Sequence, residues 1–107
     1  MSYDAVVIGA GPNGLAAAIE LQQSGCATLL VEATHRVGGA ARTEEVTLPG
    51  FLHDVGSAVP PLGIGSPFFS SLPLESFGLE WVHPEVPLAH PFDGATAALL
   101  ERDLDRT

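Results

Sequence analysis

The chain has 107 residues, with 13 acidic side chains against four arginines, no lysine and a formal net charge of −9. At this length it forms one domain at most, with a modest hydrophobic core. Its acidity disfavours nucleic acid and anionic membrane surfaces, so we expect neither as a partner.

A short apolar strand opens the chain and leads into a glycine-rich turn. Residues 5–8 are Ala-Val-Val-Ile, and this mostly β-branched run favours a strand buried on both faces of a parallel sheet. Residues 9–14 fill the pattern G-x-G-x-x-G, and we predict a helix from about Pro12 to Ser24. Strand, tight turn and helix form the context that a dinucleotide-binding motif requires.

Each glycine of the motif has its own physical reason. Gly9 permits the sharp turn, Gly11 lets the backbone approach a diphosphate, and Gly14 lets the helix pack closely on the sheet. Pro12, near the first helical position, gives up an N–H that would lack a helical partner. The remaining N–H groups, with Asn13 in the same turn, face the phosphates at the positive end of the helix dipole.

A second buried strand is predicted over residues 27–31, after Ser24-Gly25 ends the helix. It is followed by Glu32, 18 positions beyond Gly14, where the motif calls for an acid that accepts hydrogen bonds from an adenosine ribose. A carboxylate there repels a 2′-phosphate, so FAD or NAD is favoured over NADP. A glycine-rich turn without any ligand is the alternative interpretation.

The elements predicted after Glu32 are short and mainly antiparallel. Residues 44–48 and 51–55 flank the turn dipeptide Pro49-Gly50, which indicates a β-hairpin. The rest is expected to be a loop over 56–71 with one short helical turn, a short helix over 72–78, short strands over 79–83, 88–92 and 95–100, and the start of a helix over 101–107.

This order predicts an α/β fold, a Rossmann-like FAD/NAD(P)-binding β-α-β unit followed by antiparallel strands of an incomplete second sheet. We expect residues 1–58 to form the N-terminal dinucleotide-binding unit and residues 59–107 to begin a substrate-facing region. A doubly wound domain usually has five or six parallel strands, and the sequence predicts two. The chain is therefore expected to need a further C-terminal part or a partner subunit.

The segment Arg36-Val37-Gly38-Gly39, close behind the acid, carries a family resemblance. With the glycine turn it resembles the FAD-dependent oxidoreductases of the phytoene desaturase and amine oxidase group, and more closely the phytoene dehydrogenase-like NAD(P)/FAD-dependent oxidoreductases. The resemblance continues through residues 49–51 and 54–57. It implies that the R-x-G-G segment lies along the FAD pyrophosphate and that the flavin oxidises an apolar or amine small-molecule substrate. Many relatives have Arg directly after the glycine pair, whereas here Ala40-Ala41 precede Arg42.

The same loop has a physical interpretation of its own. A second glycine pair lets backbone N–H groups face a phosphate from another side, and Arg36 or Arg42 can add charge-assisted hydrogen bonds. A plain NAD site lacks this second clamp, so FAD is favoured, with NAD as the alternative. For Arg42 the alternative role is a surface ion pair with Glu44 or Glu45. The candidate cofactor-binding residues are Gly9, Gly11, Pro12, Asn13, Gly14, Glu32, Ala33, Arg36, Gly38, Gly39, Ala40, Arg42 and Thr43.

No residue is a convincing acid, base, nucleophile or metal ligand. His53, His83 and His90 lack ligand spacing, and Asp54 is expected either to stabilise the hairpin or to lie near the cofactor. Cys26, the single cysteine, is expected to be a small buried hydrophobic residue. With no signal peptide or membrane span in the pattern, a cytoplasmic location is expected. The remaining alternative is a non-catalytic nucleotide-binding fragment or split subunit.

Overall fold

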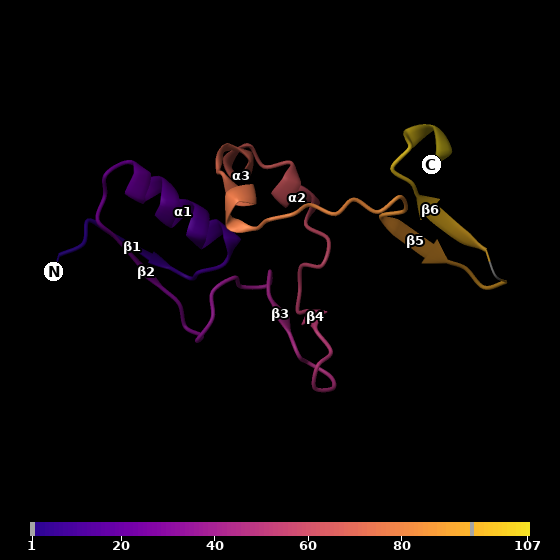
Figure 1. Cartoon of the computed structure of the whole chain (residues 1–107), viewed down its shortest axis with the longest axis horizontal. Helices are drawn as coiled ribbons and strands as arrows, with labels where there is room; N and C mark the ends of the chain where they lie inside the picture. Colours follow the sequence, from indigo (N-terminus) through magenta and orange to yellow (C-terminus); the bar gives the residue numbers. More distant parts are fainter. Residues whose placement is uncertain (1, 95) are drawn as a thin grey trace. The chain divides into compact units, whose positions relative to one another are not determined.

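The structure is a computed structural model that describes residues 2–94 and 96–107. Its backbone divides into two compact units, Met1–Pro73 and Leu74–Thr107, which are described separately. Figure 1 gives the order of the elements along the chain. The functional boundary expected between residues 58 and 59 stays a prediction.

The first unit begins with the expected β-α-β arrangement. Strand β1 (Ala5–Ile8) is followed by helix α1 (Pro12–Gln23) and strand β2 (Thr28–Val31). The two strands pair in parallel from Ala5↔Thr28 to Ile8↔Val31, and α1 lies alongside them (Figure 1). The mixed α/β, Rossmann-like fold predicted from the motif is therefore confirmed.

Helix α1 ends where the sequence predicts, for a reason that the backbone makes visible. The N–H of Gly25 donates to the Gln22 carbonyl at 3.0 Å and the N–H of Cys26 donates to the Leu21 carbonyl at 3.0 Å. Gly25 has φ of 87°, so these bonds form a Schellman motif around a left-handed glycine. Cys26 itself is half-buried, not enclosed as we expected.

The expectation that β1 is buried on both faces is wrong. Helix α1 covers the side of Ala5 and Val7, which are half-buried, whereas Val6 is 58% and Ile8 is 86% exposed. No described element covers that second face, so the apolar run meets solvent there. Among the described residues only Ala10, in the turn after β1, is fully buried.

The hairpin predicted around Pro49-Gly50 is present with a shorter ladder. Strands β3 (Thr43–Glu44) and β4 (His53–Asp54) pair antiparallel. The turn is closed by the Phe51 N–H, which donates to the Leu48 carbonyl at 3.1 Å, and Gly50 has φ of 85°. The ladder is short because residues 45–47 make no backbone hydrogen bond to the facing strand within the described residues.

Two short helices complete the first unit, where we expected one helical turn in a loop. Helix α2 (Pro61–Ile64) and helix α3 (Pro67–Ser71) each begin with proline, whose fixed φ suits the first helical position. The Ser66 hydroxyl caps α3 by accepting from the Phe69 N–H at 3.4 Å. The repeated proline start is the signal that distinguishes two turns from one.

The second unit is built from small elements with exposed surfaces. The short helix expected over 72–78 is the 3₁₀ helix η1 (Leu74–Phe77), and the expected C-terminal helix is the 3₁₀ turn η2 (Leu104–Arg106). Strands β5 (Leu88–Pro91) and β6 (Ala97–Leu100) pair antiparallel, and each of their residues is exposed. Ala95, part of the predicted last strand, lies outside the described residues.

The strand predicted over residues 79–83 is wrong. That segment has no regular structure, although its composition suggested a short strand. Pro84 and Pro87 follow it and remove backbone donors, and no neighbouring strand in the described part of the chain pairs with it. A segment with suitable composition does not form a strand when no second strand pairs with it.

Candidate functional site

The turn between β1 and α1 needs glycine at two described positions. Gly9 has φ of 96°, a region that side chains disfavour. A Cβ built on Gly14 would collide with the Gly9 carbonyl oxygen and would lie 3.0 Å from the Gly9 carbonyl carbon. The helix therefore starts directly against the end of the strand, and this close approach is the one that the third glycine of the motif predicts.

The first turn of α1 presents unpaired backbone donors. Its N-cap is Gly11, which has no side chain to cap the helix, and Pro12 occupies the first helical position. The first N–H of this turn to bond within the chain is that of Leu15, which donates to the Gly11 carbonyl at 2.9 Å. Among the described residues, none accepts from the N–H groups of Gly11, Asn13 and Gly14. Free amides at the positive end of a helix dipole attract an anion.

The second glycine cluster packs against the first. The Gly38 N–H donates to the Ala10 carbonyl at 2.7 Å, and a Cβ built on Gly39 would lie 3.0 Å from the Gly11 Cα. The N–H groups of Gly39 and Ala40 meet no acceptor within the described part of the chain. Two sets of free amides therefore lie on neighbouring segments, while the Gly38 N–H is already used inside the protein.

The segment after β4 supports this second cluster from behind. The Ser57 N–H donates to the Ala40 carbonyl at 3.1 Å, and the Val55 N–H donates to the Arg42 carbonyl at 2.9 Å. A Cβ built on Gly56 would lie 2.8 Å from the Ala40 Cβ. Glycine at position 56 thus lets the two segments approach, which gives the Asp-Val-Gly-Ser segment at residues 54–57 a structural role.

Glu32 follows the end of β2 and its carboxylate turns back to the glycine turn. Its Oε2 accepts from the Ala10 N–H at 2.7 Å, and its Oε1 accepts from the Thr34 N–H at 2.9 Å. The hydrogen bond from Ala10, followed by those from the Thr34 N–H and hydroxyl and a smaller contribution from the Ala33 N–H, lowers the pKa of Glu32 below its ordinary value of 4.5. The acid is therefore held as a carboxylate beside the turn.

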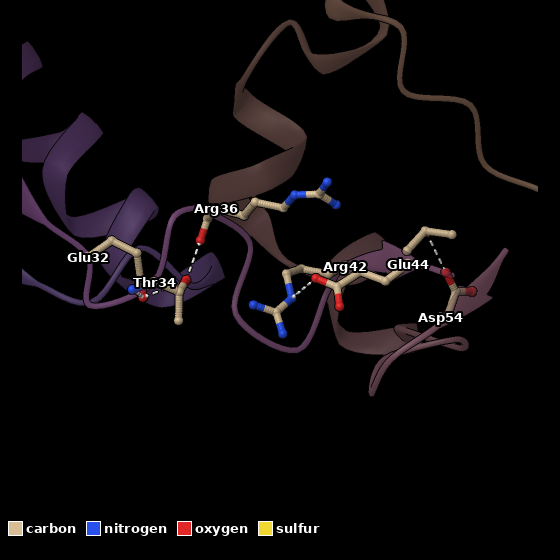
Figure 2. A network of polar contacts seen from close by, with 7 residues as sticks. Glu32, Thr34, Arg36, Arg42, Glu44 and Asp54 are labelled. Atoms are coloured by element: carbon tan, nitrogen blue, oxygen red, sulfur yellow. Dashed lines mark hydrogen bonds and ion pairs between the residues drawn. The ribbon is translucent and has the colours of Figure 1, made fainter. Parts of the chain in front are cut away.

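The two candidate arginines differ in their surroundings. Among the described residues no carboxylate forms an ion pair with Arg36, whose side chain extends away from Glu32 in Figure 2. The Nε of Arg42 lies 3.1 Å from Oε1 of Glu44, without the alignment of a hydrogen bond. The alternative role predicted for Arg42, an ion pair with a neighbouring glutamate, is thus present.

The hairpin side chains stabilise one another. The Thr43 hydroxyl donates to Asp54 at 2.7 Å, across the pair that joins β3 and β4, and the Thr47 hydroxyl lies 2.7 Å from Nε2 of His53. No three His, Cys, Asp or Glu side chains of the described residues are placed to hold a metal ion. An open pocket of about 410 Å³ is lined by His35, Arg36, Thr43, Glu44, Glu45 and Leu52.

Sequence reasoning missed two residues that connect the candidates. Ala10 donates to Glu32 and accepts from Gly38, so one peptide unit on each side of it joins the acid and both glycine clusters. Thr34 contacts Glu32 and the Arg36 carbonyl. The only signals in the sequence were the position of Ala10 between two motif glycines and a short hydroxyl-bearing residue two positions after the acid.

Together, the β-α-β unit, the uncapped helix start and the acid after the second strand define a dinucleotide-binding protein. Residues 7–63, more than half of the chain, match the NAD(P)-binding Rossmann-like domain, and the chain belongs to this family.

Three relatives illustrate the range of the family. The chain is 46% identical over 78 residues to the rat pyridine nucleotide-disulfide oxidoreductase domain-containing protein 2, covering 73% of this chain and 13% of the relative. It is 35% identical over 104 residues to one of the subunits of limonene dehydrogenase from Castellaniella defragrans, covering 97% of this chain and 19% of the relative. It is 51% identical over 55 residues to a lycopene-forming phytoene desaturase of Paracoccus, covering 51% of this chain and 11% of the relative.

The chain thus spans a fifth or less of the length of these relatives. The resemblance to the phytoene desaturase and amine oxidase group is confirmed over the N-terminal part, where the chain is similar to a phytoene desaturase and to (S)-6-hydroxynicotine oxidase. A dinucleotide is therefore the class of cofactor that the family supports. No helix in the described part of the chain is long and apolar enough to cross a membrane; α1 has 12 residues.

Proposed function

We propose that this chain holds the ADP half of FAD as the dinucleotide-binding part of an FAD-dependent oxidoreductase. The observation that carries the proposal is the contact between Gly11 and Gly39, where a Cβ on Gly39 would lie 3.0 Å from the Gly11 Cα. Two neighbouring segments with free amides suit a diphosphate, which carries negative charge on two linked groups. A side chain at Gly11 or Gly39 would occupy the space between the two segments. Glycine at both positions therefore leaves room for the backbone to approach a diphosphate closely.

Each proposed site residue has a role that follows from its position. The amides of Gly11, Asn13, Gly14, Gly39 and Ala40 face the diphosphate, with Gly38 keeping the second cluster against Ala10. Arg36 supplies a positive charge without a carboxylate partner among the described residues, and Glu32 accepts from the adenosine ribose. The full proposed set is Gly9, Gly11, Pro12, Asn13, Gly14, Glu32, Ala33, Arg36, Gly38, Gly39, Ala40, Arg42 and Thr43.

The chemistry in this proposal belongs to the cofactor, whose flavin accepts a hydride or electrons from the substrate. We assign no catalytic residue to this chain. The names of the relatives, a limonene dehydrogenase and a phytoene desaturase, support an apolar small-molecule substrate, and (S)-6-hydroxynicotine oxidase supports an amine as the alternative. The proposed location is the cytoplasm, which cell fractionation tests.

A further C-terminal part or a partner subunit completes the enzyme in this proposal. The exposed face of β1, with Val6 58% and Ile8 86% exposed, favours such an addition because an apolar strand face gains stability when it is covered. The alternative is a nucleotide-binding fragment or split subunit without activity of its own. Turnover by the isolated 107-residue chain would eliminate that alternative.

Titration of the chain with FAD, NAD and NADP, followed by calorimetry and thermal unfolding, tests the choice of cofactor. Selective binding raises the unfolding temperature, and we expect FAD to raise it most and NADP least. Preference for NAD would replace FAD by NAD on the same fold. Absence of binding by all three would overturn the proposed site.

The Gly11→Ala variant isolates the diphosphate contact. Its new methyl group would lie 3.8 Å from the Gly39 Cα, an ordinary contact, so the fold tolerates it while the phosphate approach is blocked. We expect a loss of FAD affinity of about tenfold or more. Gly65→Ala is the matched control, because Gly65 has φ of −78° and its added methyl meets only the Pro61 carbonyl oxygen at 3.5 Å. Equal affinity for the two variants would contradict the proposed phosphate position.

A further inference from the structure

Thr34 bonds to the acid and to the loop that follows it. Its N–H donates to Oε1 of Glu32 at 2.9 Å, and its hydroxyl donates its single hydrogen either to the same oxygen, at 3.1 Å, or to the Arg36 carbonyl, at 2.8 Å. Figure 2 shows the Thr34 side chain between the Glu32 carboxylate and the Arg36 backbone. The residue therefore contacts both the proposed ribose acid and the segment that leads into Gly38-Gly39.

The hydroxyl of Thr34 has one hydrogen and two acceptors within reach. The Arg36 carbonyl is the nearer, at 2.8 Å against 3.1 Å for Glu32 Oε1. While the hydrogen points to Glu32, the hydroxyl is a third donor to the carboxylate. While it points to Arg36, the Thr34 N–H alone holds Oε1, and Ala10 holds Oε2 at 2.7 Å. A carboxylate has about four acceptor positions, so each oxygen then keeps one open position for a ligand hydroxyl.

Hydrogen bonds connect the glycine turn, the acid and the second glycine cluster to one another. Ala10 donates to Glu32 and accepts from the Gly38 N–H at 2.7 Å, while Thr34 connects Glu32 to Arg36. The acid, the backbone of Arg36 and the second glycine cluster are thus fixed to one another before any ligand binds. Such preorganisation lowers the cost of ordering a site when it binds.

We propose that Thr34 is a positioning residue that orients Glu32 for the ribose and at the same time fixes the Arg36–Gly39 segment for the diphosphate. This inference rests on the proposed function, because it assigns a role toward the same nucleotide. It goes beyond it by coupling the two halves of the site through one hydroxyl group. Thr34 therefore affects diphosphate binding indirectly, and we propose no direct contact between Thr34 and the phosphates.

The donors that face Glu32 come from two segments, and none is a charged side chain. Ala10 lies in the turn after β1, and Ala33 and Thr34 lie in the loop of Glu32 itself. The nearest titratable side chains in sequence are His35 and Arg36, neither of which pairs with it among the described residues. A change in the titration of Glu32 on removal of the Thr34 hydroxyl therefore reports the loss of that donor.

The first test needs no nucleotide. Amide signals of Ala10 and Thr34 are followed by NMR as a function of pH in the 107-residue chain, in Thr34→Val and in Thr34→Ser. We expect both signals to share one midpoint in the unaltered chain, a higher midpoint in Thr34→Val, and return toward the original value in Thr34→Ser. An unchanged midpoint in Thr34→Val, or no return with serine, would overturn the proposal.

The second test measures binding of FAD, ADP and AMP to the same variants. We expect Thr34→Val to weaken ADP about three- to tenfold, the effect of one hydrogen bond, and to weaken AMP less, because AMP lacks the second phosphate. Thr96→Val is the control, since the Thr96 hydroxyl makes no hydrogen bond within the described residues. Equal losses of ADP and AMP affinity in Thr34→Val would contradict the proposed coupling between the ribose acid and the diphosphate segment. If the unaltered chain binds no nucleotide, the proposed function fails and the titration alone decides the role of Thr34.

Discussion

Two of the three two-stranded sheets in the described part of the chain have strands of equal length but very different surroundings. β1 and β2 pair over four residues each in parallel, and β5 and β6 pair over four residues each in antiparallel. Helix α1 covers one face of the first pair, whereas every residue of the second pair is exposed. The two sheets therefore have equally long strand pairs. They differ in the elements packed around them: α1 and the glycine turn adjoin the first pair, and no described helix covers the second.

Among the described residues, each unit has one arginine in an ion pair and one without, Arg36 in the first unit and Arg102 in the second, so the free backbone amides distinguish the first unit. In the second unit the Nε of Arg106 lies 3.0 Å from Oε2 of Glu101, and this pair lines an open pocket of about 330 Å³. In the first unit Arg36 has no carboxylate partner within the described residues, and five backbone N–H groups of the two glycine clusters are free. A positive site without internal compensation is suited to an anionic ligand, so the comparison favours the first unit as the binding unit.

The largest effect is expected for Gly14→Ala, which breaks the contact between α1 and the end of β1. The added Cβ would collide with the Gly9 carbonyl oxygen, and the helix must move away to relieve it. We expect the first unit to lose about 2 to 3 kcal/mol of unfolding free energy. Urea unfolding followed by amide NMR signals of Val7 in β1 and Ala89 in β5 measures the two units separately.

A matched change in the other sheet sharpens this measurement. Leu99, in β6, is 43% exposed, so Leu99→Thr is expected to change the unfolding free energy of the second unit by less than about 1 kcal/mol. Loss of the Val7 and Ala89 signals at one common urea concentration in the Gly14→Ala chain would mean that the two units unfold as one. The comparison between them would then lose its energetic basis.

The next effect is expected for Glu32→Gln, which keeps the shape of the side chain and removes its charge. One of the two carboxylate oxygens becomes an NH₂ group, which cannot accept from the donors of Ala10 or Thr34. We expect FAD to bind about tenfold or more weakly. Calorimetric titration measures this, and unchanged affinity would place the ribose elsewhere.

The ionisation of Glu32 should also make the unfolding free energy of the first unit depend on pH. The folded chain lowers the pKa of Glu32, chiefly through the Ala10 N–H, so the ionised acid stabilises the folded state at pH values above its unfolded pKa. This contribution is lost as the pH falls from about 4.5 through the lower folded value. Glu32→Gln should flatten this part of the pH profile of the first unit, and an equally steep profile in the variant would assign the dependence to other carboxyl groups.

The smallest effect is expected for Glu44→Gln, which releases Arg42. The two side chains are 25% and 28% exposed, and their atoms are 3.1 Å apart without hydrogen-bond alignment. We expect a change of less than about 1 kcal/mol in unfolding free energy. FAD affinity measured on the same variant shows whether the released guanidinium assists a diphosphate; an affinity that does not rise would leave Arg42 a purely structural residue.

Local patterns were sufficient to predict the elements around the glycine turn. The position of Gly25 two residues after Gln23 indicated the end of α1, and Pro49-Gly50 indicated the turn of the hairpin. In these cases the deciding interactions lie within a few residues of one another. The sequence shows these φ preferences directly, because glycine permits positive φ and proline fixes φ near −65°.

Interactions between distant segments could not be predicted in the same way. The 2.7 Å bonds of Ala10 to Glu32 and to Gly38 join residues 22 and 28 positions apart, and they depend on the angle at which the loop returns. The exposure of Ile8 was also missed, because an apolar pattern shows what a strand can bury but not whether a covering layer exists. The strand expected over 79–83 failed for the matching reason that no described strand pairs with it.

The Schellman cap at the far end of α1 has a practical consequence. It places Cys26, the sole thiol of the chain, beyond a helix of 12 residues that is about 18 Å long, with the glycine turn that we propose binds the diphosphate at the opposite end. A maleimide dye on Cys26 would therefore lie at the other end of α1 from the glycine turn, at a separation suited to energy transfer with a fluorescent nucleotide bound at the proposed site. Cys26 is therefore a natural attachment site for a dye in energy-transfer distance measurements, with no engineered cysteine required.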